Sequence, residues 1–169
     1  MIALVVVSFL LPFLGGALTL VIPRSWVKRF SQLIAVLAFG CSLFVLIDFT
    51  ASGQIRTSID LVVFAERIVV FGVTIDQLSA LIGLAVSLVG CLIVIYSTGY
   101  LSAENREHPE HDLKRRYYFF LLIFIGSMAG LIYSSTLIGL LLFFELTGVC
   151  SWGLIGYYDD VKARKAALK

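Results

Sequence analysis

The segment LIGLLLFFELTGVCSWGLIGYY, residues 137–158, decides how the rest of the chain is interpreted. It is apolar over a length that can cross a bilayer, yet it carries one carboxylate, Glu145, near its middle. At a rise of about 1.5 Å per residue, Glu145 would lie about 12 Å inside the segment. An ionised side chain at that depth costs several kcal/mol unless it is paired, hydrated or protonated. We therefore expect Glu145 to be a functional residue.

The helical period predicts which residues lie beside Glu145. On a period of 3.6 residues the acid shares a face with a set of apolar and small residues: Leu141, Gly148, Val149, Trp152 and Gly156. The two glycines would allow another helix or a thread of water to approach the carboxylate closely. Two interpretations stay open: Glu145 handles a proton, or it is a buried, neutral, hydrogen-bonded acid that only holds helices together.

Composition identifies the class of protein. With 60% hydrophobic residues, 14% charged residues and a mean hydropathy of +1.00, the chain is too apolar for a soluble domain of 169 residues. It is therefore predicted to be an integral membrane protein. The net charge of +2 is small and the basic residues lie at segment ends, so nucleic acid is not an expected partner. The three cysteines lie in separate apolar segments, without the spacing of a metal site or a disulfide framework.

The apolar runs predict a single all-α transmembrane domain over residues 1–169. The loop at 50–74 is expected outside the cell and the loop at 102–116 in the cytoplasm. Residues 159–169 resemble a cytoplasmic lead-in to a sixth helix. The five predicted membrane helices cover approximately residues 2–22, 27–47, 76–100, 117–133 and 137–158.

The basic residues predict the orientation of the chain. Of the 13 Lys and Arg residues, all except Arg56 and Arg67 follow the first, third or fifth segment. These residues would lie on one side of the membrane, and by the positive-inside rule that side is the cytoplasm. We therefore expect the amino terminus outside and the carboxyl terminus in the cytoplasm.

The outside loop carries two local patterns. The runs LVVF and IVVF flank Glu66 and Arg67, which favours a β-hairpin, with an irregular loop as the alternative. Next, Thr74 and Gln77 have the spacing of a capping box at the start of the third helix. Asp76 would be favourable at that positive helix end. It is also the candidate for a secondary polar site, although capping is the preferred interpretation.

The cytoplasmic loop contains His108 and His111, which have the spacing of a metal-binding pair. Pro109 lies between them, acids lie on both sides, and no further ligand is near in the sequence. A solvated loop without a metal is the better interpretation, and it could contact neighbouring subunits.

Five short motifs carry a resemblance to a known family. The motifs are IYSTGYL (95–101), ENREHP (104–109), GSMAGL (126–131), SSTL (134–137) and FFELTGVCSW (143–152). With these motifs the chain resembles the antiporter-like membrane subunits shared by respiratory complex I, Mrp sodium/proton antiporters and membrane-bound hydrogenases, and most of all hydrogenase-4 component D. The likeness is strongest from Asp76 onward.

The resemblance implies a long all-helical subunit with two inverted five-helix repeats, each holding a broken helix. Glu145 matches the family's acid on the fifth helix, which pairs with a lysine on the broken seventh helix. This sequence departs from the pattern because it holds only the front of such a subunit, without the pairing lysine. We expect a truncated or split form of a longer subunit, and truncation is favoured.

The function expected from the resemblance is proton or sodium translocation in the membrane arm of a redox-driven complex of the hydrogenase-4 or formate hydrogenlyase type. The chain would not be an enzyme by itself. Glu145 would be the proton relay, with Gly148, Trp152 and Gly156 packing around it. The alternatives are an Mrp-type antiporter subunit, a complex I antiporter-like subunit, and a structural membrane anchor with a neutral Glu145.

The same resemblance predicts where the chain works and with what. It would be a multi-pass protein of a bacterial or archaeal cell inner membrane, surrounded by other membrane subunits and peripheral redox subunits. No cofactor and no metal is expected in this chain. Iron–sulfur and nickel–iron sites are expected in partner subunits.

Overall fold

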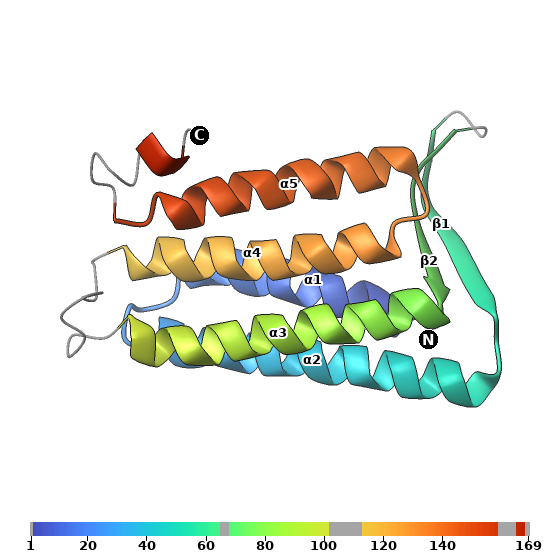
Figure 1. Ribbon diagram of the computed structural model, residues 1–169, viewed down its shortest axis with the longest axis horizontal. Helices are drawn as coiled ribbons and strands as arrows, with labels where there is room; N and C mark the ends of the chain where they lie inside the picture. Colours follow the sequence, from blue (N-terminus) through green and yellow to red (C-terminus); the bar gives the residue numbers. More distant parts are fainter. Residues whose placement is uncertain (1, 65–67, 102–112, 159–164, 168–169) are drawn as a thin grey trace.

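The computed structural model describes residues 2–64, 68–101, 113–158 and 165–167. Five helices lie side by side, successive helices run in opposite directions, and a β-hairpin lies at one end (Figure 1). All five helices are long and apolar enough to cross a membrane. The elements are α1 (Ile2–Thr19), α2 (Val27–Ser52), β1 (Arg56–Phe64), β2 (Ile68–Asp76), α3 (Gln77–Tyr100), α4 (Lys114–Tyr133) and α5 (Leu137–Ile155).

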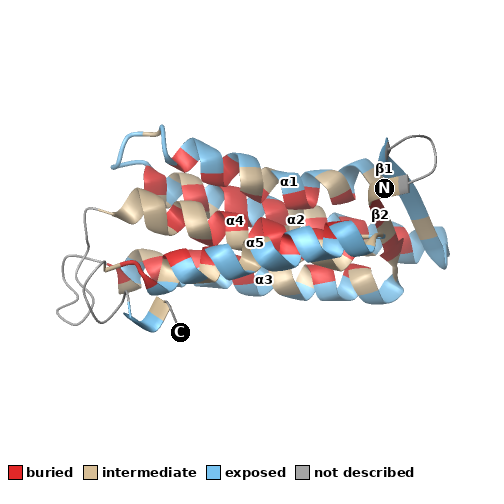
Figure 2. Ribbon diagram, turned by 90° about the horizontal axis from the view of Figure 1, so that it is seen from above, coloured by how far each residue is buried: buried red, intermediate tan, exposed pale blue. Residues whose placement is uncertain are grey.

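Helix α4 is the centre of the bundle and α5 is its outermost helix. Helix α4 packs against α1, α3 and α5, whereas the main helical neighbour of α5 is α4. In the most apolar stretch of each helix, 50% of the residues of α4 are buried but only 22% of those of α5. Figure 2 shows exposed residues along the outward side of α5. One side of α5 is therefore uncovered in this structure.

Two helices extend further than the apolar runs predict. Helix α2 continues past residue 47 to Ser52, and α4 begins at Lys114 instead of residue 117. Polar residues outside the apolar run can stay helical because backbone hydrogen bonds do not require an apolar environment. Helix α2 ends where Gly53 adopts a left-handed conformation with φ of 63°, which glycine accepts without steric cost.

Helices α1 and α5 end earlier than the apolar runs predict. Helix α1 stops at Thr19 instead of residue 22, and α5 stops at Ile155 instead of residue 158. At the end of α1 the backbone changes to shorter-range turn bonds, such as Leu20 N to Ala17 O at 3.2 Å. At the end of α5 the same change occurs, with Tyr157 N bonded to Leu154 O. Tightened last turns of this kind satisfy carbonyls that a longer helix would have used.

The hairpin interpretation of the outside loop is confirmed, so the fold has a small β element besides its helices. Strands β1 and β2 form an antiparallel pair in which Arg56 lies opposite Asp76. The turn with Glu66 and Arg67 lies outside the described residues. Strand β2 is tied to the α4–α5 connection by Ser135 N to Gly72 O at 2.9 Å. The hairpin thereby closes one end of the bundle.

The capping box at the start of α3 is present but lies two residues later than predicted. Asp76, not Thr74, is the N-cap: its Oδ1 accepts a 2.7 Å hydrogen bond from Ser79 N, and Ser79 Oγ accepts a 2.8 Å bond from Asp76 N. Thr74 lies in β2, opposite Ser58 of β1. Strand pairing continues through Asp76, which displaces the helix start.

Removal of the Asp76 cap should destabilise the protein. The pKa of Asp76 lies below its ordinary value of 3.8, mainly because Ser79 N donates to the ionised carboxylate. We expect Asp76→Ala to lower the free energy of unfolding by about 1 kcal/mol, and Asp76→Asn to cost much less because asparagine also caps. Because folding lowers this pKa, the ionised Asp76 carboxylate stabilises the folded protein above pH 3.8. As the pH falls through the lowered pKa the carboxylate is protonated, and the extra stability of the parent over Asp76→Asn is lost. Unfolding in detergent, followed by circular dichroism at several pH values, measures both effects. Equal stability of the parent, Asp76→Ala and Asp76→Asn at neutral pH would contradict the capping role.

The orientation of the chain is a second testable expectation. Arg24 and Lys28, at the α1–α2 connection, lie at the same end of the bundle as the start of α4, and Arg56 lies at the hairpin end. A reporter fused after Lys169 should therefore report the cytoplasm, and one inserted at Gly53 should report the outside. The reverse labelling would overturn this orientation.

Candidate functional site

The inward face of α5 consists of small and apolar residues that pack on α4 and, around Gly139 and Phe143, also on β2 and α1. Gly139, Phe143, Cys150 and Gly153 are the buried residues of this helix. A Cβ on Gly153 would lie 2.5 Å from the ring of Phe120 of α4, so the glycine allows the two helices to approach closely. This face of α5 is fully used for packing within the bundle.

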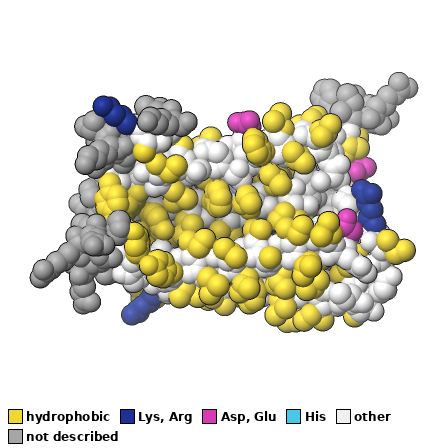
Figure 3. All heavy atoms as spheres, viewed as in Figure 1, with side chains coloured by type: hydrophobic (Ala, Val, Ile, Leu, Met, Phe, Trp, Pro, Cys, Tyr) yellow, Lys and Arg dark blue, Asp and Glu magenta, His cyan; other side chains and the backbone are white. Residues whose placement is uncertain are grey.

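Glu145 lies on the other face of α5 and is exposed, so the prediction of a buried acid is wrong for the described chain. Its neighbours on this face are exposed as well, with Leu141 at 58% and Trp152 at 47% of their full accessibility. Within the described residues, no hydrogen bond or ion pair involves the carboxylate. Figure 3 shows hydrophobic side chains over much of the described surface of the helices, with few charged side chains between them. Glu145 is the only acid of α5, the uppermost helix of Figure 1.

The structure brings together most of the predicted surroundings of Glu145. Gly148 is exposed and a Cβ built on it meets no atom within 4 Å, so this face is open at the backbone level. Gly156 does not belong to this surface: it is buried at the C-cap of α5, one residue past the helix. We call Leu141, Glu145, Gly148 and Trp152 the outward face of α5.

An exposed acid in the middle of a membrane-length helix sets a physical requirement. In hydrocarbon the ionised carboxylate would need a cation, water or a proton, and Glu145 obtains none of these from the described side chains. A neighbouring helix could supply the partner, because Gly148, one turn away, allows close backbone approach. The arrangement is therefore suited to exchange of a proton between Glu145 and a group outside this bundle.

Asp76 does not join Glu145 in one site. It caps α3 at the hairpin end, and Arg56 across the sheet favours its ionised form. Glu145 lies about 12 Å along α5 from Leu137, its first residue. The structure thus supports the capping interpretation of Asp76.

The predicted loop site with His108 and His111 lies outside the described residues. In the part of the chain that the structure describes, no group of three His, Cys, Asp or Glu side chains could hold a metal ion. The three cysteines are free thiols.

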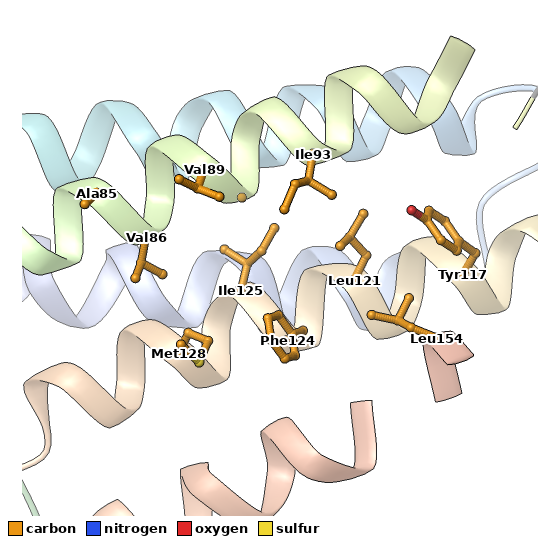
Figure 4. Close-up of a pocket in the computed structure, with 11 residues that line it drawn as sticks. Ala85, Val86, Val89, Ile93, Tyr117, Leu121, Phe124, Ile125, Met128 and Leu154 are labelled. Carbon is orange, nitrogen blue, oxygen red and sulfur yellow. The ribbon is translucent and has the colours of Figure 1, made fainter. Parts of the chain in front are cut away.

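One feature was missed from the sequence: an apolar cavity of about 460 Å³ that opens between α3 and α4 (Figure 4). The available signal was a run of small and β-branched residues on one face of α3, including Ala85, Val86 and Val89. Such residues leave space beside a helix, but a sequence does not show which neighbour would fill it.

Comparison with known proteins places part of the chain in a family context. Residues 68–120, which cover β2, α3 and the start of α4, match the family described as NADH-Ubiquinone oxidoreductase (complex I), chain 5 N-terminus. This match ends before α5, so it does not include Glu145.

Individual relatives agree with that match. The NAD(P)H-quinone oxidoreductase chain 5 of Picosynechococcus sp. is 42% identical over 92 residues, which cover 54% of this chain and 13% of the relative. The chain 5 protein of Synechocystis sp. is 41% identical over 92 residues, covering 54% of this chain and 12% of the relative. The chloroplastic subunit 5 of Poa pratensis is 41% identical over 88 residues, covering 52% and 12%. The matched stretch thus spans about an eighth of the length of these relatives.

These matches support the superfamily of antiporter-like membrane subunits that the sequence motifs indicated, and a multi-pass membrane protein. These three relatives are NAD(P)H-quinone oxidoreductase chain 5 or subunit 5 proteins of cyanobacteria and a chloroplast, so the finer resemblance to hydrogenase-4 component D is not shown. The location in a bacterial or archaeal inner membrane stays a prediction.

Proposed function

We propose that the chain is the front part of an ion-translocating membrane-arm subunit in a redox-driven complex, with Glu145 as a proton-relay acid. The observation that carries this proposal is the carboxylate in the middle of α5, which has no partner among the described side chains and lies on an apolar face with an open glycine beside it. A purely structural anchor has no need of an ionisable group at that place, because such a group destabilises a helix in hydrocarbon.

The type of complex we propose is an NAD(P)H-quinone oxidoreductase of complex I type, because the similar proteins carry that name. The hydrogenase-4 or formate hydrogenlyase type is the second candidate, and its support is the set of motifs around Tyr100 and Glu145 alone. In either case the chain supplies no catalytic residue, and the redox cofactors belong to partner subunits.

The proposed mechanism uses the electrostatics of Glu145. In an apolar surrounding the neutral, protonated form of a carboxylic acid is favoured. When a cationic side chain of a neighbouring helix approaches the outward face of α5, the ionised form is favoured and the proton leaves. Movement of that cation toward and away from Glu145 therefore couples charge displacement to proton transfer.

Purification from native membranes tests the proposal. A tag at the carboxyl end of the natural gene product should bring down further membrane subunits and peripheral redox subunits. Vesicles that contain the complex should acidify or alkalinise their interior only when the electron donor is added. NAD(P)H oxidation with quinone reduction identifies the complex I type, whereas hydrogen evolution identifies the second candidate.

Two results would contradict this function. Ion exchange across vesicles without any co-purifying redox subunit would favour an Mrp-type antiporter. A complex with full redox-driven translocation after loss of the Glu145 carboxyl would make this helix structural.

A further inference from the structure

The apolar cavity between α3 and α4 has the shape of a groove on the surface of the bundle. Figure 4 shows Val89 and Ile93 of α3 on one side and Leu121 and Ile125 of α4 on the other. Leu154 of α5 lies at one end. No charged side chain of the described residues lines it. Two of the side chains of α3 at the groove are largely exposed, with Val89 at 54% and Ile93 at 43%.

The length of the groove matches one leaflet of a membrane. It runs along α4 from Tyr117 to Met128, which corresponds to about 16 Å at the helical rise. The hydrocarbon core of a bilayer is about 30 Å thick, so each leaflet contributes about half of that. A chain of methylene groups that lay in this groove would reach from the membrane surface to the midplane.

A second cavity continues the groove at its outer end. It has a volume of about 200 Å³, and it shares Tyr117 and Leu154 with the groove. The rest of its wall is formed by Tyr100, Leu101, Ile155, Tyr157 and Tyr158. Tyrosines are typical of the boundary between hydrocarbon and headgroups, where the ring is apolar and the hydroxyl reaches polar groups. The groove is thus apolar at its inner end and able to form hydrogen bonds at its outer end.

Positive charge lies at the same outer end. Arg116 reaches across to α5. Its Nη2 would lie 3.9 Å from a Cβ built on Gly156, the residue immediately before Tyr157 of the second cavity. Its guanidinium also stacks at 5.8 Å over the ring of Phe120. A ligand that filled both cavities would place its polar end beside Arg116.

We propose that this groove is a binding site for an anionic phospholipid. One acyl chain lies between α3 and α4, the glycerol region lies among the tyrosines, and the phosphate pairs with Arg116. The positive end also lies on the side that we predict to be cytoplasmic, where membranes carry anionic lipids. The preference for an anionic over a neutral phospholipid comes from the charge of the headgroup. Burial of the acyl chain adds little, because the chain exchanges the apolar bilayer for an equally apolar groove.

Native mass spectrometry of the protein in mild detergent tests the proposal with two added lipids, phosphatidylglycerol and phosphatidylcholine, that have identical acyl chains. We expect one phosphatidylglycerol to be retained with an apparent affinity about fivefold or more above that of phosphatidylcholine, the ratio that one cation near a membrane surface supplies. Arg116→Gln should reduce this preference while a lipid of either kind is still retained weakly. Val89→Trp, which fills the groove, should reduce retention of both lipids.

Matched variants separate the site from general effects. Arg29→Gln removes the same charge from an exposed position at the start of α2, and Leu88→Trp adds the same bulk to an exposed position of α3 outside the groove. Both should retain phosphatidylglycerol as the parent does. Ile93→Trp gives a second filled groove, and circular dichroism checks that each variant is folded.

Several results would overturn the proposal. Equal retention of the two lipids by the parent protein would exclude an anionic site. Unchanged retention by both folded tryptophan variants of the groove would place the lipid elsewhere. A dimer, or a helix of another subunit seated on α3 and α4 in the native complex with no lipid retained, would show that protein covers the groove.

Discussion

Replacement of Glu145 by glutamine in the complete complex is expected to lower redox-driven ion translocation about tenfold or more while assembly is unchanged. The amide keeps the shape and most hydrogen-bonding capacity of the acid but has no titratable proton. Loss of a positioned proton-transfer group commonly lowers a rate by a factor of about 100 or more. The smaller expected factor of about ten allows for protons that pass the variant through water. A neutral amide is also easier to place in hydrocarbon than an unpaired carboxylate, so the variant should insert normally.

Translocation is measured as the pH change inside vesicles per electron transferred, and assembly is measured by subunit content. Glu145→Asp should give an intermediate rate, because it keeps the proton but shortens the side chain by one methylene. Asp48→Asn is the control, since it removes an exposed acid from the extended end of α2 and should leave the rate unchanged. A Glu145→Gln complex that assembles fully and translocates like the parent would refute the relay role.

The sequence was sufficient to predict the membrane helices, and it favoured the hairpin without excluding an irregular loop. Apolar runs of membrane length have no stable alternative to a helix in a bilayer, because each backbone group must be bonded within the segment. The hairpin followed from two β-branched runs around a polar turn. Helix ends were less predictable, as at Ser52 and Lys114, since helices can continue into polar sequence beyond the hydrocarbon.

The position of Glu145 relative to the bundle could not be derived in the same way. Periodicity placed Glu145, Gly148 and Trp152 on one face, and the structure agrees. Helix α5 is apolar on nearly all sides, however, so its sequence does not indicate which face packs on α4. That choice depends on complementary shapes, such as Gly153 against Phe120, and these exist only once the two helices are together.

Two glycines of α5 should respond in opposite ways to the same substitution. Gly153→Leu should destabilise the isolated chain by about 3 kcal/mol, because the new side chain would enter the space of the Phe120 ring. Gly148→Leu should leave that stability nearly unchanged, because a Cβ at Gly148 meets no atom within 4 Å. Unfolding in detergent measures both, and a similar loss for the two variants would contradict the assignment of inward and outward faces.

In the complete complex the Gly148→Leu variant becomes a test of what covers α5. If another helix approaches the outward face closely enough to meet Glu145, a leucine one turn away must push that helix outward. We then expect reduced translocation, or reduced content of the neighbouring subunit, although the isolated variant is as stable as the parent. Phe144→Ala changes an exposed side chain elsewhere on α5 and serves as the control. Normal translocation in a fully assembled Gly148→Leu complex would mean that lipid, not a helix, covers the outward face of α5. The cation that the relay mechanism needs could then not reach Glu145, and the mechanism would be wrong.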